Sequence, residues 1–191
     1  MKRKFKSIVS LTILISSTPA IAEEVKREGI YLDFGLSSST LDVDTSPKSF
    51  DGSASSLVLG TGYRFNQYVS YGVEFRGIGS ANTSFSTGSL DVDGTWWGMN
   101  VSGYYPLSEH FELTARLGTG TLLLEQETID INGANTDETK DWEIGINYSL
   151  GATYSFNPSW SMTLEWTNYS ADFDGIDVSS DSFALMARKS F

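Results

Sequence analysis

The sequence predicts an all-β fold, an eight-stranded antiparallel transmembrane β-barrel of the up-and-down type. Three observations predict it: apolar residues alternate with small or polar ones, the alternating segments number eight, and their connections are alternately short and long. The chain has 191 residues, no cysteine, 18 glycines and 13% aromatic residues, and its mean hydropathy is −0.17. This composition excludes a disulfide framework and a polytopic helical membrane protein.

The amino terminus, residues 1–22, has the layout of a secretory signal peptide. A basic region with Lys2, Arg3, Lys4 and Lys6 precedes the apolar run IVSLTILI at 8–15, which is too short to span a bilayer. We expect cleavage between Ala22 and Glu23, after the small residues of AIA. The mature domain, 23–191, then keeps 9 of the 13 basic and all 24 acidic residues, for a net charge of −15. Such a charge excludes a nucleic acid as partner.

Eight segments in order carry the alternation that predicts strands. The first two are 29–37 and 56–65, and the third sets Val69, Tyr71, Val73 and Phe75 against Ser70, Gly72, Glu74 and Arg76. The fourth is 95–105, and the fifth sets Phe111, Leu113, Ala115 and Leu117 against Glu112, Thr114, Arg116 and Gly118. The sixth segment, 142–156, is the longest and has apolar residues at every even position. The seventh and eighth segments are 160–167 and 182–191.

The connections predict the topology. Short ones at 66–68, 106–110 and 157–159 alternate with long ones at about 38–55, 79–94, 125–141 and 168–181. Short periplasmic turns and long external loops are typical of outer-membrane barrels, and an even number of strands places both chain ends in the periplasm. The pattern G-x-x-Y-x-F-N occurs at 60–66 and again at 151–157, each time before a short turn.

The two faces of the predicted strands have different chemistry. Aromatic residues stand at both ends of the apolar face, which is typical of a lipid-facing band with two girdles. The other face is rich in glycine and also carries charges, as expected for the narrow lumen of eight strands. A soluble β-sandwich or a lipocalin-like barrel is the alternative.

The predicted lumen carries charges of both signs, five acidic and four basic. By alternation, the residues that point inward are Asp33, Glu74, Glu112, Glu143 and Glu165 together with Arg64, Arg76, Arg116 and Arg188. Because an unpaired buried charge is costly, we interpret them as a structural ion-pair core rather than as catalytic carboxylates. Glu74, Arg76, Arg116 and Glu165 are expected to meet near the middle of the lumen.

No residue set predicts a reaction, a cofactor or a dedicated metal site. The only histidine, His110, adjoins Ser108 and Glu109, but three residues of one short turn cannot converge as a catalytic triad. The long connections hold 15 acidic residues opposed only by Lys48 and Lys140. They form a solvated anionic surface or a weak calcium or magnesium site, and divalent cations could bridge them to lipopolysaccharide phosphates.

The whole mature chain resembles the small OmpA/OmpX-like outer-membrane β-barrel proteins, a class that includes opacity-type surface antigens. The resemblance is carried by GYRFN at 62–66, by SGYYPLSEHFELTARLG at 102–118 and by the final Phe191. It implies that Phe191 is the aromatic signal recognised by the barrel-assembly machinery. Lys189 departs from the signature, which has an apolar residue there.

These observations lead to one functional hypothesis and two alternatives. The chain is expected in the outer membrane of a Gram-negative bacterium, among lipid and lipopolysaccharide, with a structural or surface-interaction role and a host or cell-surface ligand as a candidate partner. The first alternative is a small, low-conductance porin, which a glycine-rich lumen favours. The second is a lipid A-modifying enzyme, for which the chain lacks a histidine near the outer girdle.

Overall fold

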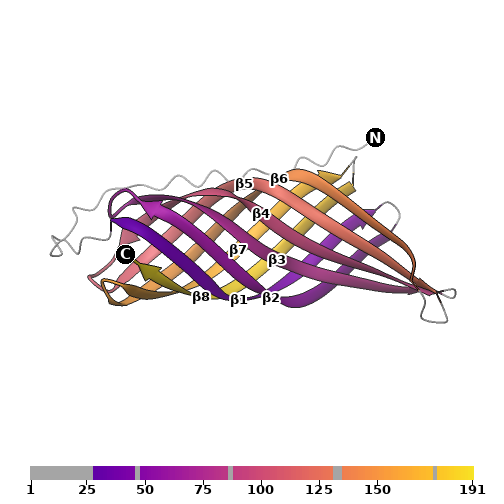
Figure 1. Cartoon of the computed structure of the whole chain (residues 1–191), viewed down its shortest axis with the longest axis horizontal. Helices are drawn as coiled ribbons and strands as arrows, with labels where there is room; N and C mark the ends of the chain where they lie inside the picture. Colours follow the sequence, from indigo (N-terminus) through magenta and orange to yellow (C-terminus); the bar gives the residue numbers. More distant parts are fainter. Residues whose placement is uncertain (1–27, 46–47, 86–87, 131–134, 174–175) are drawn as a thin grey trace.

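The computed structural model is a closed antiparallel barrel in which each strand pairs with the next and β8 pairs with β1 (Figure 1). It describes residues 28–45, 48–85, 88–130, 135–173 and 176–191. The strands are β1 (Gly29–Thr45), β2 (Lys48–Arg64), β3 (Val69–Phe85), β4 (Gly88–Pro106), β5 (Phe111–Asp130), β6 (Asn135–Asn157), β7 (Trp160–Phe173) and β8 (Ile176–Ser190). The predicted fold class is confirmed. The expected signal peptide, with Ala22 and Glu23, lies outside the described residues.

The register of the pairs defines the geometry of the barrel. Following hydrogen-bonded neighbours from Asp33 around the eight strands returns to β1 at Val43, ten residues farther along. A stagger of this size tilts the strands by roughly 35–45° to the axis and leaves an interior that side chains just fill. In the described part of the chain, no helix is long and apolar enough to cross a membrane.

Three short turns, the start of β1 and the end of β8 share one end of the barrel, which we call the short-turn end. The Asn66 side-chain oxygen accepts hydrogen bonds from the amides of Tyr68 and Val69, at 2.8 and 3.0 Å. Asn157 does the same for Ser159 and Trp160, at 2.9 and 3.0 Å. The repeated sequence pattern therefore ends in an asparagine because that side chain satisfies the amides of a tight turn.

At the opposite end, the long-hairpin end, the expected long loops are wrong. Strands continue through most of 38–55, 79–94, 125–141 and 168–181, so the connections are paired hairpins rather than loops. Serine, aspartate and glycine made these stretches look like loops, yet their backbone groups are paired in regular ladders.

Near the long-hairpin end the wall of the barrel divides into two sheets. In the described residues, pairing of β2 with β3 stops at Val58 and Arg76, and pairing of β6 with β7 stops at Gly145 and Ala171. Beyond these points β7-β8-β1-β2 form one sheet and β3-β4-β5-β6 the other. In Figure 1 the hairpins β3–β4 and β5–β6 converge at the right, away from the ends of β1–β2 and β7–β8.

Candidate functional site

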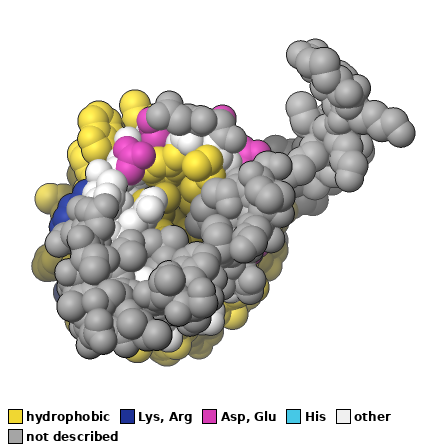
Figure 2. Space-filling view, turned by 90° about the vertical axis from the view of Figure 1, so that its right-hand side faces the viewer, with side chains coloured by type: hydrophobic (Ala, Val, Ile, Leu, Met, Phe, Trp, Pro, Cys, Tyr) yellow, Lys and Arg dark blue, Asp and Glu magenta, His cyan; other side chains and the backbone are white. Residues whose placement is uncertain are grey.

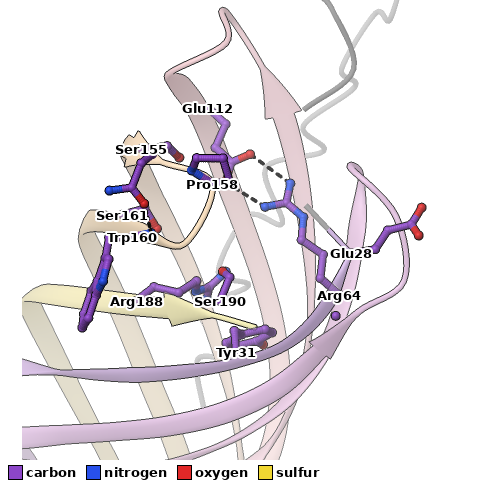
Figure 3. Close-up of a pocket in the computed structure, with 12 residues that line it drawn as sticks. Glu28, Tyr31, Arg64, Glu112, Ser155, Pro158, Trp160, Ser161, Arg188 and Ser190 are labelled. Carbon is purple, nitrogen blue, oxygen red and sulfur yellow. Dashed lines mark hydrogen bonds and ion pairs between the residues drawn. The ribbon is translucent and has the colours of Figure 1, made fainter. Parts of the chain in front are cut away.

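The candidate site is the interior of the barrel, in which side chains form three levels from the short-turn end upward. Two bidentate ion pairs occupy the first level. Arg64 donates to both oxygens of Glu112 at 3.0 and 2.9 Å, and Arg188 donates to both oxygens of Asp33 at 2.7 and 2.8 Å. Figure 3 shows the contacts of the Arg64–Glu112 pair, which lines a small cavity together with Tyr31 and Arg188.

Tyrosine rings complete this first level. The guanidinium of Arg64 lies 3.8 Å from the ring centre of Tyr104, and that of Arg188 lies 3.9 Å from the ring centre of Tyr31. Arg188 also donates to the Tyr104 hydroxyl at 2.9 Å. Stacked and bidentate contacts of this kind suit the planar guanidinium. Apart from the small cavity, the short-turn end of the lumen is therefore filled by mutually bonded groups.

Four charged residues from β3, β5 and β7 meet at the second level. Arg76 contacts Glu74 at 3.1 Å and Glu165 at 2.9 Å, and Arg116 contacts the same two carboxylates. All four side chains are at most 4% exposed. Each arginine thus bridges both acids, so the group is electrically neutral as a whole. We call Glu74, Arg76, Arg116 and Glu165 the central quartet.

Polar neighbours hold the central quartet in place. Tyr169 donates to Glu74 at 2.8 Å and Thr167 donates to Glu165 at 3.1 Å. Buried atoms without a hydrogen-bond partner remain nearby among the described residues, including the Oδ1 atoms of Asn100 and Asn147. Such atoms are commonly satisfied by internal water.

The structure brings together eight of the nine predicted lumen residues, in two bidentate pairs and one quartet. Glu143 is the exception, because no arginine of the described chain contacts it and its side chain is only half-buried. It pairs in register with Leu122, above the quartet, where the surrounding side chains are apolar.

The third level is an apolar cluster that the alternation pattern did not predict. It lies between the two sheets of the long-hairpin end: one contributes Leu41, Tyr169, Ala171, Phe173 and Val178, and the other contributes Ile78, Trp96, Leu122 and Leu124, with Val92 at the edge. Trp96 is 1% exposed and its ring lies 5.1 Å from that of Tyr169. This arrangement is the core of a β-sandwich.

A bulge in β3 directs one side chain into this apolar cluster. The register of β3 with β4 shifts between Gly77 and Gly79, which leaves Ile78 fully buried. The Ile78 carbonyl accepts a hydrogen bond from the hydroxyl of Ser180 across the barrel. Gly79 has a φ of +126°, which only glycine adopts readily, and a Cβ there would lie 3.0 Å from Leu41.

The lumen glycines make room for aromatic side chains. A Cβ at Gly98, Gly120 or Gly145 would lie about 3 Å from the ring of Trp96. A Cβ at Gly62 or Gly72 would collide with the Tyr31 hydroxyl. At these positions the glycine-rich face therefore reflects close packing of rings against the wall.

The two faces of the strands exchange polarity partway along the barrel. On β7 the outward residues Trp160, Met162, Leu164 and Trp166 are followed by Asn168, Ser170 and Asp172, while the inward ones change from Ser161, Thr163, Glu165 and Thr167 to Tyr169, Ala171 and Phe173. On β8 the outward Leu185 and Phe183 give way to Asp181, Ser179 and Asp177. An apolar exterior with a polar lumen suits lipid, and the inverted pattern suits water.

The outward apolar band is uneven around the barrel. On β6 it continues through Tyr148 and Ile146 to Trp142, all strongly exposed. In register with Tyr148 and Ile146, the outward residues of β7 are Asn168 and Ser170. Figure 2, a view of the long-hairpin end, shows acidic side chains along one border of hydrophobic ones.

The described residues hold no group of three or more His, Asp or Glu side chains suited to a metal ion.

The short turn at 107–110 has a structural arrangement. The Ser108 hydroxyl accepts hydrogen bonds from the amides of His110 and Phe111, at 3.4 and 3.1 Å. The Nδ1 of His110 lies 2.9 Å from the carbonyl oxygen of Ser155, across the turn. Serine and histidine are thus engaged with the backbone rather than with each other.

Comparison with known proteins agrees with this geometry. The Neisserial surface protein NspA is 16% identical, with 85% of this chain and 97% of that chain covered and a TM-score of 0.57. OprG from Pseudomonas aeruginosa is 13% identical (88% and 99% covered, TM-score 0.52). Ail from Yersinia pestis, solved in complex with the heparin analogue sucrose octasulfate, is 14% identical (84% and 99% covered, TM-score 0.51). At such identities the likeness shows the fold alone.

Sequence comparison gives the family. No curated protein matches the chain significantly. Residues 8–191 match the family described as the outer membrane protein beta-barrel domain, which is nearly the whole chain. The predicted resemblance and the predicted cellular location are thereby confirmed. The chain belongs to the outer-membrane β-barrel protein family and is a protein of the cell outer membrane.

Proposed function

We propose that this protein is a closed, non-conducting barrel that anchors in the outer membrane and presents its four long hairpins for surface interaction. One observation carries the proposal: the interior is filled at every level. Ion pairs with stacked tyrosines fill the short-turn end, the central quartet fills the middle, and the apolar cluster fills the long-hairpin end. Water-filled passage would require the displacement of groups that are bonded or packed at all three levels.

The same observation argues against the alternative of a small porin. A conducting lumen needs a continuous polar path, whereas Trp96, Ile78 and Leu122 are at most 1% exposed and lie across the axis above the quartet. An apolar constriction of this kind excludes water and ions. Internal water near Asn100 and Asn147 would be enclosed between this constriction and the ion pairs below.

The proposed orientation places the short-turn end in the periplasm and the long hairpins outside. It rests on the short turns at one end and on strands that extend beyond the apolar band at the other. The outward wall of the extension carries Asp93, Asp177 and Asp181, all exposed. A surface of this charge suits cationic partners or lipopolysaccharide bridged by divalent cations.

The surface charge also bears on the kind of ligand. Ail was solved with a polyanionic heparin analogue, whereas this chain has a formal net charge of −11. Like charges repel, so a polyanion would bind here only through bridging cations. We assign the protein no reaction, since Ser108 and His110 have turn-forming roles.

Conductance in planar bilayers tests the proposal. We expect purified wild-type barrel to show no steady single-channel steps, because no continuous water path crosses the apolar cluster. Arg116→Ala and the double variant Arg116→Ala/Trp96→Ala should also remain closed, because the ion pairs and stacked tyrosines of the short-turn end stay in place. Reproducible single-channel conductance from the wild type would overturn the closed-lumen proposal and favour the porin.

A further inference from the structure

Among the basic side chains that the structure describes, Lys189 alone has no carboxylate partner. The four arginines of the lumen are bonded to Asp33, Glu74, Glu112 or Glu165, and the exposed Lys140 contacts Glu125 at 3.0 Å. The chain contains 24 acidic and only 13 basic residues. In so acidic a protein, an isolated cation at a defined position requires an explanation.

Lys189 lies on the outward, lipid-facing side of β8. It pairs in register with Leu32 of β1 and Trp160 of β7, whose side chains are 45% and 42% exposed on the same face. Its ammonium nitrogen is 5.1 Å from the ring centre of Trp160 and 5.8 Å from that of Phe191. In Figure 3 Trp160 lies at the side of the cavity away from Arg64 and Glu112.

This position corresponds to the membrane interface at the short-turn end. Trp160 and Phe191 belong to the aromatic girdle that borders the apolar band, and tryptophan prefers that depth. A lysine there can lay its stem along apolar side chains while the ammonium reaches the headgroup layer. Placing a lysine near the interface costs little, unlike placing it at the bilayer centre.

We propose that Lys189, together with Trp160 and Phe191, binds the phosphate of an anionic phospholipid at this interface. The ammonium supplies the charge, and the two rings confine it to one side of β8 while the acyl chains lie along Leu32 and its apolar neighbours. No carboxylate of the described residues pairs with the Lys189 ammonium, so the ammonium is available to the lipid phosphate. The identity of the leaflet, the periplasmic one, rests on the orientation proposed above, whereas the binding itself does not.

Native mass spectrometry of the folded barrel in detergent tests the site. The barrel is titrated with phosphatidylglycerol and, separately, with phosphatidylcholine of the same acyl chains, and the ratio of the two association constants is measured. One lysine near an anionic lipid surface contributes enough for a preference of about fivefold. We expect this ratio in the wild type, a ratio near one for Lys189→Gln, and a retained preference for Lys189→Arg.

Matched controls separate the site from general charge effects. Lys140→Gln removes the same charge from a lysine that already has a carboxylate partner, so the preference should persist. Folding of each variant is checked by heat-modifiable mobility in gels, and Trp160→Leu provides a second variant with a reduced preference if Lys189→Gln does not fold. Excess inorganic phosphate should not compete with phosphatidylglycerol for the site. If it competes fully, the site binds free phosphate rather than lipid, and the proposal is overturned. An equal affinity for both lipids in the wild type would also overturn it, independently of the conductance result.

Discussion

Replacing Arg116 with alanine perturbs the centre of the lumen. Arg116 contacts Glu74 and Glu165, whose side chains are 3% and 1% exposed, and Arg76 contacts the same two acids. Without Arg116 one arginine faces two buried carboxylates, so one negative charge remains uncompensated. Removing one partner of a buried ion pair costs about 3–5 kcal/mol, because the remaining charge stays in a poorly solvated site. We expect the free energy of unfolding to fall by this amount.

The assay is denaturant unfolding of the barrel folded into lipid vesicles, followed by tryptophan fluorescence and by heat-modifiable mobility. Arg116→Ala/Glu165→Gln removes the excess charge and should recover a large part of the loss, since Arg76 and Glu74 remain as a neutral pair. Lys140→Ala is the matched control, because Lys140 and Glu125 are 54% and 44% exposed. An exposed pair contributes at most about 1 kcal/mol.

Two outcomes would refute the reasoning. One is a loss for Arg116→Ala no larger than that for Lys140→Ala, which would mean that solvent already compensates the quartet. The other is a double variant that is as unstable as the single one. In that case the lost packing of the arginine stem, rather than the uncompensated carboxylate, would account for the effect.

Three further predictions concern the rest of the barrel. Trp96→Ala should lower the free energy of unfolding by about 3–5 kcal/mol by opening a cavity in the apolar cluster, whereas the outward Trp97→Ala should cost clearly less in the same unfolding assay. Protease added to intact cells should cut within 38–55, 79–94, 125–141 or 168–181, and cleavage that requires a permeabilised outer membrane would contradict the proposed orientation. The amide of Phe191 donates to the Ile30 carbonyl at 3.0 Å. Deleting Phe191 should leave little heat-modifiable barrel and much unfolded precursor in the periplasm. Normal insertion of the shortened chain would contradict the role of Phe191 in assembly.

The half of the barrel near the short turns was readable from the sequence because one rule holds along its strands. Apolar residues face lipid there and polar ones face the lumen, so alternation identifies both the strand and its outward face. The same alternation gave the inward position of Arg76 and Arg116. It also led to the expectation that Glu74, Arg76, Arg116 and Glu165 meet near the middle of the lumen. The acids that Arg64 and Arg188 contact were not readable, since they depend on the ten-residue stagger of the strands.

The other half was misread because the rule reverses without any break in the strands. Beyond Thr167 on β7, the apolar residues Tyr169, Ala171 and Phe173 are inward and polar ones are outward. Alternation persists there, and its continuation beyond Trp166 was the signal that could have revealed both the longer strand and the apolar cluster. Glu143 was placed in the ion-pair core by alternation alone, although it stands one level above the quartet.

The uneven apolar band has a consequence for how the protein sits in its bilayer. Hydrocarbon beside β6 can rise as far as Ile146 and Trp142, while beside β7 the polar Asn168 and Ser170 stand in register with Tyr148 and Ile146. A bilayer of uniform thickness can cover both sides only if the barrel axis leans away from the membrane normal or if the lipids beside β7 and β8 become locally thinner. In either case the lipids beside β6 are ordered differently from those beside β7 and β8. If the barrel leans, the long hairpins also leave the membrane at an inclination rather than upright.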